Sequence, residues 1–329
     1  MNSRRRALYA GLALSFAVAV GYGLLWRAGA KEMQRAIADW AAAQRASGVY
    51  VDYGSIRVVG FPVMLRGLVL DASIGDAAGR TWRANTLRID ARLLSPRSLI
   101  FSAPKGEAVY LGDAGRWRID APSGRVRLTS LSKGRWALDV SASGAAAMRA
   151  DENASAGISR LVVVLDGKAD PERLAAHFEF DDVSARLGNA KAAIEKITAD
   201  VELQKATALA RGAEAWRGAG GALAVKQFTL EAEGAYLAAH GSLMLDSEGF
   251  PEGVLEAEVA NPGALAALLG KIGAISADEA KQAQANLTLA VLAGGGKLSG
   301  LLVLKNGELS FAGARLARLS RIAPAPVQP

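Results

Sequence analysis

Residues 49–70 read VYVDYGSIRVVGFPVMLRGLVL, and this stretch decides the fold class. Apolar and polar residues alternate from Val49 to Tyr53, which is the two-residue period of a strand with one buried face. The turn sequence Gly60-Phe61-Pro62 interrupts the pattern, and apolar positions resume at Val63. Short strands separated by turns at this spacing predict an antiparallel meander.

The same pattern covers most of the remaining chain and predicts a mainly β fold (β-rich α+β) in which a few helices pack on curved antiparallel sheets. The following strands are expected: 49–53, 56–58, 63–70, 87–93, 108–111, 117–119, 126–128, 136–140, 161–165, 178–187, 199–203, 228–232, 236–245, 253–260, 286–292, 298–304 and 308–312. Residues 190–198 are ambiguous, and 204–221 are expected to form a loop or loose helix. Helices are expected at 170–177, at 262–271 and from Ser276 to about Gln284.

The start of the chain predicts a membrane anchor. Residues 7–26 carry no charge, and at about 1.5 Å per residue they span roughly 30 Å, the thickness of a hydrocarbon core. The basic cluster Arg4, Arg5 and Arg6 precedes this run, while Tyr22 and Trp26 lie near its far end. Such a cluster holds the N-terminus in the cytoplasm, so the bulk of the chain is expected in the periplasm. A cleavable signal peptide ending at Ala28-Gly29-Ala30 is the alternative.

Composition excludes several kinds of site. The chain has no Cys and two His, so disulfide frameworks, thiolate metal sites and multi-histidine centres are ruled out. The net charge of +7 is dilute, because residues 31–148 hold 17 basic and 10 acidic residues whereas 149–329 hold 18 and 22. No basic arm is present, and anionic lipid explains the excess as well as nucleic acid does. We expect no nucleic-acid partner and no cofactor.

Candidate reactive residues are isolated. His177 and His240 stand in no catalytic or metal-binding motif, and Asp181-Asp182 is typical of solvated charges, so no catalytic residues are assigned and a non-enzymatic protein is expected. Three tryptophans each open an expected strand, namely Trp82, Trp117 and Trp136. Core packing is the simpler interpretation of these tryptophans, and contact with an apolar ligand is the alternative.

The expected organisation has five parts. Residues 1–30 are the basic start and anchor, and 31–48 form a juxtamembrane helix that docks on the next domain. Residues 49–203 and 204–322 form two β-rich regions, the second with two short helices, and 323–329 form a disordered tail rich in proline.

A family resemblance follows from the order of these features. The anchor, the helix that bears Trp40, the motif Gly60-Phe61-Pro62 and the later Trp82-Arg83-Ala84 resemble a bacterial domain-of-unknown-function family of exported, N-terminally anchored proteins. The segments 241–249 and 302–309 are also similar to those of AsmA-like envelope proteins. That second resemblance implies long sheets with a groove for lipid acyl chains, or a role in outer-membrane assembly.

These observations predict a non-enzymatic protein of the bacterial inner membrane that acts in envelope maintenance. Its expected partners are membrane lipid or envelope assembly proteins. The alternative is a scaffold that recruits envelope proteins by strand addition, without a lipid. An apolar sheet face must be covered by helices, lipid or a partner. Whether the three expected helices cover all of it decides between a groove and a closed structure.

Overall fold

The computed structural model describes residues 3–76, 79–93, 95–104, 107–111, 115–131, 134–151, 153–167, 170–188, 190–209, 211–271, 275–276, 278, 280–281, 284–285, 297–311, 313–319 and 321–322. The side chains of 3–17, 95–96, 107–108, 110–111, 187, 297, 314 and 317 lie outside this description. The chain forms two compact units, Met1–Arg118 (unit 1) and Ile119–Pro329 (unit 2), each of which is β-rich and is described by itself.

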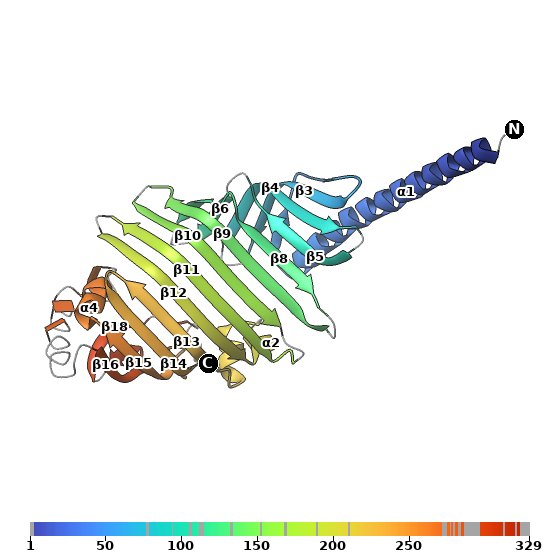
Figure 1. Ribbon diagram of the computed structural model, residues 1–329. Coiled ribbons are helices and arrows are strands. Elements are labelled where there is room, and N and C mark those ends of the chain that lie inside the picture. The colour runs from blue at the N-terminus through green and yellow to red at the C-terminus, as the bar shows by residue number, and fades with distance from the viewer. Residues whose placement is uncertain are drawn as a thin grey trace. The chain divides into compact units, whose positions relative to one another are not determined.

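Unit 1 contains one long helix and a small antiparallel sheet (Figure 1). Two long strands, β3 (Met64–Gly75) and β4 (Arg80–Arg92), pair along their length at its centre. Each has two shorter strands on its other edge: β1 and β2 pair with β3, and β5 and β6 pair with β4. The bounds of the remaining elements of this part are α1 (Ser3–Ala46), β1 (Tyr50–Asp52), β2 (Ser55–Val59), β5 (Ser95–Ser102), β6 (Glu107–Leu111) and, across the unit boundary, β7 (Arg116–Asp120).

Helix α1 packs on one face of the unit 1 sheet. Met33 and Ile37 contact it over Gly67, where an added Cβ would lie 3.1 Å from Met33 Cε and 3.4 Å from Ile37 Cδ1. Glycine at this position therefore lets the helix approach the strand. Within the segment 31–48, which was expected to dock on the next domain, Ala41 is buried whereas Trp40 is about half exposed. The first part of α1 projects beyond the sheet (Figure 1).

Among the described residues, no helix combines the length and the apolar character that crossing a membrane requires. Most of the expected anchor, 7–26, and the three basic side chains Arg4, Arg5 and Arg6 fall on residues 3–17, whose side chains lie outside the described part.

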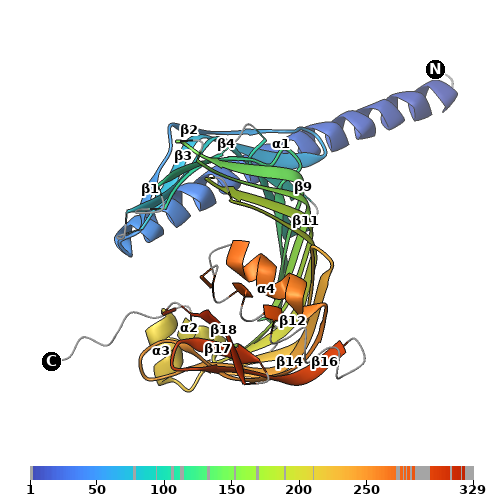
Figure 2. The same ribbon diagram turned by 90° about the vertical axis from the view of Figure 1, so that its left-hand side faces the viewer.

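Unit 2 is an antiparallel meander in which each strand from β8 to β18 pairs with the next one along the chain. Its sheet is strongly curved (Figure 2). The four strands β9 to β12 are 14 or 15 residues long, much longer than the sequence pattern predicts. The strand bounds are β8 (Arg125–Ser130), β9 (Trp136–Arg149), β10 (Ala154–Gly167), β11 (Arg173–Leu187), β12 (Ala190–Gln204), β13 (Leu223–Ala232), β14 (Ala235–Leu245), β15 (Pro251–Ala260), β16 (Lys297–Lys305), β17 (Glu308–Phe311) and β18 (Ala314–Arg318).

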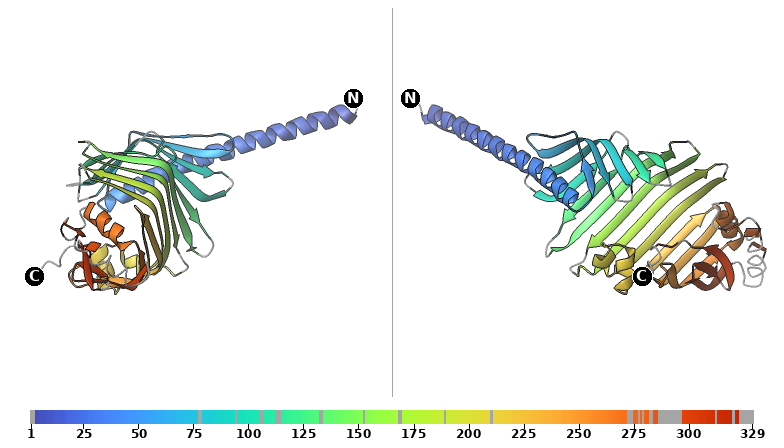
Figure 3. Two further views of the ribbon diagram at one scale, coloured as in Figure 1. Left: turned by 60° about the vertical axis from the view of Figure 1, so that its left-hand side comes forward. Right: turned by 180° about the vertical axis from the view of Figure 1, so that it is seen from behind.

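Helix α4 (Pro262–Lys271) lies inside the curve of this sheet (Figures 2 and 3) and confirms the helix expected there. Its Leu265 and Ala266 belong to a hydrophobic core that also holds Val259, Leu302 and Phe311. Two short helices, α2 (Ala206–Leu209) and α3 (Ala213–Gly218), form in the segment expected to be a loop or loose helix. Of these residues, Trp216 is buried and donates a hydrogen bond from Nε1 to the Gln204 carbonyl at 2.7 Å.

The prediction of a helix at 170–177 is wrong. Asp170 forms a turn in which its carboxylate accepts a hydrogen bond from the Glu172 backbone N–H at 3.0 Å, and β11 begins at Arg173. Apolar residues at every second position from Leu174 through Ala176 and Phe178 to Phe180 extend the strand instead. The ambiguous segment 190–198 is strand as well. The strand expected at 286–292, the tail at 323–329 and most of the helix expected from Ser276 lie outside the described residues.

Candidate ligand-binding face

Strands β9, β10 and β11 carry three parallel rows of apolar side chains on one face. Residues directly opposite each other on antiparallel strands point to the same side of a sheet. The rows are Ala142–Leu161–Phe180, Val140–Val163–Phe178 and Leu138–Leu165–Ala176. Each row continues onto β12 and β13, and in the row of Ala176 the next residue, Val201, packs against the core around α4 while Val225 belongs to that core. The rows therefore lie on the inner face of the curved sheet, the face that α4 covers further along.

The inner face of β9–β11, which we call the open face, is incompletely covered. All nine side chains of its three rows are only partly buried, and none belongs to the hydrophobic core around α4. The rings of Phe178 and Phe180 stack with centroids 6.4 Å apart. The helix expected at 170–177 was one of three candidates to cover an apolar sheet face, but those residues form a turn and the start of β11. A contiguous apolar surface of this kind is typical of a site for an apolar ligand or partner.

The opposite, outer face of the same strands is charged. Glu179 lies between two cations, at 3.5 Å from Arg160 Nη2 and 3.2 Å from Lys196 Nζ. The hydrogen bond from Lys196 and the positive charge of Arg160 lower the pKa of Glu179 and outweigh its partial desolvation. The same hydrogen bond raises the pKa of Lys196. Strands with one ionic face and one apolar face expose the apolar face only at a cost in free energy, unless something covers it.

Both histidines lie on this outer face and take part in cross-strand pairs. His177 Nδ1 is 2.8 Å from Asp200 Oδ1, and His240 Nε2 is 3.4 Å from Glu256 Oε2. An open depression of about 690 Å³ extends over β13 to β16 and includes His240 and Glu256 in its lining. Within the described part of the chain, no three acidic, His or Cys side chains gather as metal ligands. The expectation that the chain is not an enzyme stays a prediction.

The three tryptophans singled out from the sequence lie in different settings. Trp82 on β4 packs beside the buried Val69 and Ile89 of unit 1, as core packing predicts. Trp117 is partly buried in β7. Trp136 begins β9 opposite Gly167, and its indole covers that glycine so closely that a Cβ there would lie 2.4 Å from the ring. Trp136 therefore continues the inner face at one end of the open rows, whereas Trp82 belongs to the core of unit 1.

The residues of the open face itself were not selected from the sequence. The sequence pattern that indicates this face lies in β11, where Phe178 and Phe180 alternate with Glu179 and Asp181. A strand with this alternation has one apolar face, but the sequence does not show which face a helix covers.

Gly60-Phe61-Pro62 forms the turn between β2 and β3, beside α1. The Tyr22 hydroxyl donates a hydrogen bond to the Pro62 carbonyl at 2.6 Å. The Phe61 ring meets Trp26 edge-on, with centroids 5.7 Å apart and an interplanar angle of 90°. The structure thus brings together two residues expected at the end of the anchor and the turn motif, a contact that the sequence did not predict.

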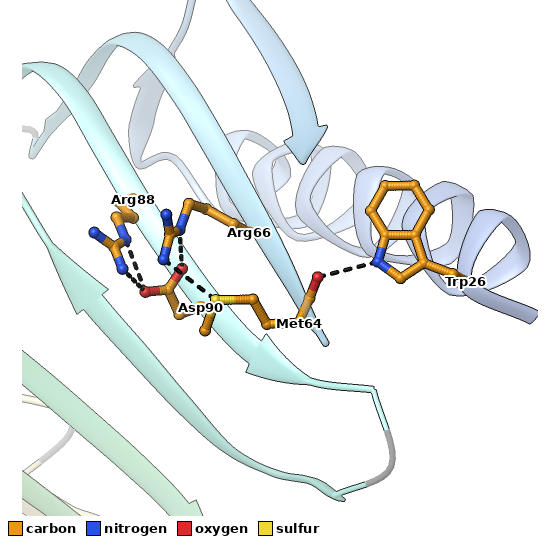
Figure 4. Close-up of polar contacts among 5 residues, drawn as sticks. All are labelled: Trp26, Met64, Arg66, Arg88 and Asp90. Carbon is orange, nitrogen blue, oxygen red and sulfur yellow. Dashed lines mark hydrogen bonds and ion pairs between the residues drawn. The ribbon is translucent and has the colours of Figure 1, made fainter. Parts of the chain in front are cut away.

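A buried ion cluster lies on the other side of β3 and β4 from α1 (Figure 4). Asp90 accepts hydrogen bonds from Arg66 Nε at 2.8 Å and from Arg88 Nε at 2.7 Å. Burial raises the pKa of Asp90, but the hydrogen bonds and charges of Arg88 and Arg66 outweigh it, so the pKa lies below its ordinary value. Met64 joins this cluster to α1, because Trp26 Nε1 donates to its carbonyl at 3.0 Å while Arg66 contacts its sulfur. The cluster joins β3 to β4, and Met64 joins β3 to α1.

Comparison with known families identifies the chain. Residues 26–320 match the model of a family described as an uncharacterized protein conserved in bacteria, DUF2125. The chain belongs to this family, so the expected membership of a bacterial family of unknown function is confirmed, whereas the match does not bear on the Gly60-Phe61-Pro62 motif or on the AsmA-like resemblance. No curated protein and no solved structure matches the chain.

Proposed function

We propose that this bacterial protein is anchored in the inner membrane by residues 7–26, extends into the periplasm, and shields lipid acyl chains on the open face of β9–β11. Its role would be the maintenance of the cell envelope, without a catalytic step, in the manner implied by the likeness to AsmA-like proteins. The observation that carries the proposal is the set of three apolar rows left partly exposed on one face of strands whose other face is ionic.

The geometry of the open face favours an extended apolar ligand. Its rows run across three adjacent strands, which lie about 4.8 Å apart, and they merge with the core around α4. Nothing charged stands within the nine positions, so the face offers no partner for a polar head group. An acyl chain matches this surface, because it buries apolar area without requiring hydrogen bonds.

The proposed anchor is supported by the sequence at the start of the chain. The uncharged run at 7–26 follows three consecutive arginines, an arrangement that retains the N-terminus in the cytoplasm. A fusion of alkaline phosphatase to the C-terminus is expected to be active, since that enzyme requires the periplasm. Activity of a C-terminal reporter that works only in the cytosol would reject the topology.

A matched pair of substitutions tests the lipid proposal. Val162 and Val163 are neighbours on β10, are both partly buried, and point to opposite faces. Val163 lies between Val140 and Phe178, whereas Val162 lies between Ser141 and Glu179. Val163→Lys would place a cation in the open face, and Val162→Lys would place the same cation beside an existing carboxylate.

The measurement is the amount of lipid that co-purifies with the full chain, extracted and quantified by mass spectrometry. Lipid around the anchor is common to all three proteins, so the difference between variants reports the open face. We expect Val163→Lys to lose the tightly held lipid and Val162→Lys to retain the wild-type amount. Equal lipid in all three chains would reject the proposal, and a stoichiometric protein in place of lipid would favour the scaffold alternative.

A further inference from the structure

The turn between β2 and β3 exposes apolar side chains beside α1. Val63 is 75% exposed and Phe61 is 59% exposed, while Val59 at the end of β2 is also exposed. Exposed apolar residues are common when they stand alone, but these lie within five residues of one another on one turn. Their concentration at this place calls for a partner that accepts apolar groups.

Helix α1 also exposes apolar side chains where it lies beside this turn. Leu24 and Leu25 are exposed on the turns of α1 that carry Tyr22 and Trp26. A hollow of about 440 Å³ opens between helix and turn, and it is lined by Val20, Gly23, Leu24, Trp26, Arg27 and Phe61. The turn and the helix therefore present one continuous apolar surface, which ends at the charged Arg27.

Hydrogen bonds and ring contacts fix the turn against the helix. Tyr22 and Trp26 donate to backbone carbonyls of Pro62 and Met64, so the polar atoms of both aromatic side chains are satisfied within unit 1. The Phe61 ring lies 5.7 Å from Trp26 and 6.4 Å from Tyr22. Three aromatic side chains are thus grouped at one level of the helix, beside a basic residue. Tyr, Trp and Arg in this arrangement are typical of the interface between membrane and water.

We infer that the β2–β3 turn is a second membrane contact, which inserts Phe61 and Val63 into the lipid leaflet from which α1 emerges. This inference rests on the proposed anchor. The occupant of the surface is membrane lipid, because the turn is continuous with the part of α1 that the anchor proposal places at the end of the hydrocarbon core. Insertion at a second point would hold unit 1 against the bilayer and restrict its rotation about the helix.

The absence of cysteine from the chain allows a direct test by single-cysteine labelling. Nitroxide labels are placed separately at Val63→Cys on the turn, at Leu24→Cys on the helix and at Leu301→Cys on β16, all exposed positions. Each full-length variant is reconstituted in vesicles of phosphatidylethanolamine and phosphatidylglycerol. The relative accessibility of each label to oxygen, which concentrates in the bilayer, and to a water-soluble nickel chelate is then measured by electron paramagnetic resonance.

We expect the labels at positions 63 and 24 to be more accessible to oxygen than to nickel, and the label at 301 to show the reverse. A label at 63 that is open to nickel, with 24 still in the bilayer, would overturn the inference and leave the anchor intact. Exclusion of both reagents at 63 would show that protein covers the turn, which also overturns it. A label at 24 that is open to nickel would reject the anchor and, with it, the second contact.

Discussion

The two halves of unit 2 carry the same apolar rows but cover them differently. One row runs across both halves: Leu165 on β10 is followed by Ala176, Val201, Val225, Gly241, Leu255 and Leu302. At the β15 end Leu255 is 7% exposed and belongs to the core around α4, whereas Leu165 is only partly buried. A strand pattern thus creates an apolar face, and the presence of a helix decides whether that face becomes core or remains open for a ligand.

The largest expected effect on stability comes from substituting these two leucines, Leu255 and Leu165, by alanine. Leu255→Ala removes a side chain from a closed core and is expected to lower the free energy of unfolding by about 2–5 kcal/mol. Leu165→Ala removes the same atoms from a partly exposed row and is expected to cost about 1–2 kcal/mol. Denaturant unfolding of the two delipidated variants measures both losses in the free energy of unfolding. Equal losses would mean that the open face is covered in solution.

Charged side chains extend the comparison to unit 1, where an ion cluster is buried. The Asp90 side chain is 10% exposed and those of Arg66 and Arg88 are about a third exposed. Asp90→Asn leaves the two arginines facing each other without their counter-charge, and it is expected to cost about 1–3 kcal/mol, less than a fully buried pair. Glu248→Gln, which breaks an exposed pair with Arg321, is the control and is expected to cost less than about 1 kcal/mol.

The pH dependence of this loss has a defined sign. Because the pKa of Asp90 is lowered in the folded state, its contribution to stability is present above the ordinary aspartate pKa and is lost as the pH falls through the lowered value. The difference between wild type and Asp90→Asn should therefore shrink in acid. A difference that stays constant down to the lowest pH would contradict the assignment of the lowered pKa to Asp90.

The smallest expected effect concerns the outer face of the sheet at β9–β11, opposite the open face. Glu179 has a lowered pKa because Lys196 donates a hydrogen bond to it. Lys196→Met is expected to move the pKa of Glu179 back toward its ordinary value, and carbon-detected nuclear magnetic resonance titration of the carboxylate measures this shift. Lys205→Met, on a lysine that pairs with Glu172 instead, should leave Glu179 unchanged. An unshifted Glu179 in Lys196→Met would show that the pair is not formed in solution.

Local sequence patterns predict the antiparallel meander, but they do not predict which part of its inner face a helix covers. Alternation identified most strands because it is a property of adjacent residues. The helix prediction at 170–177 failed because it rested on Asp170-Pro171, which resembles a helix start but forms a turn. The lengths of β9 to β12 were underestimated, since Ala, Ser and Gly positions such as Ala145 to Ala147 carry little alternation. The position of α4 over β12 to β18, and the contact of Phe61 with Trp26, depend on packing between distant segments. Sequence periodicity carries no information on such packing.

The most direct test of the lipid-binding face is to locate the lipid on the full chain. Cells that express the protein are fed a fatty acid with a photoreactive group near the end of its acyl chain, are irradiated, and the crosslinked peptides are identified by mass spectrometry. The account predicts crosslinks on the inner-face residues of β9–β11, such as Val163 and Phe178, in addition to those around residues 7–26. Crosslinks confined to residues 7–26, with none on β9–β11, would contradict it.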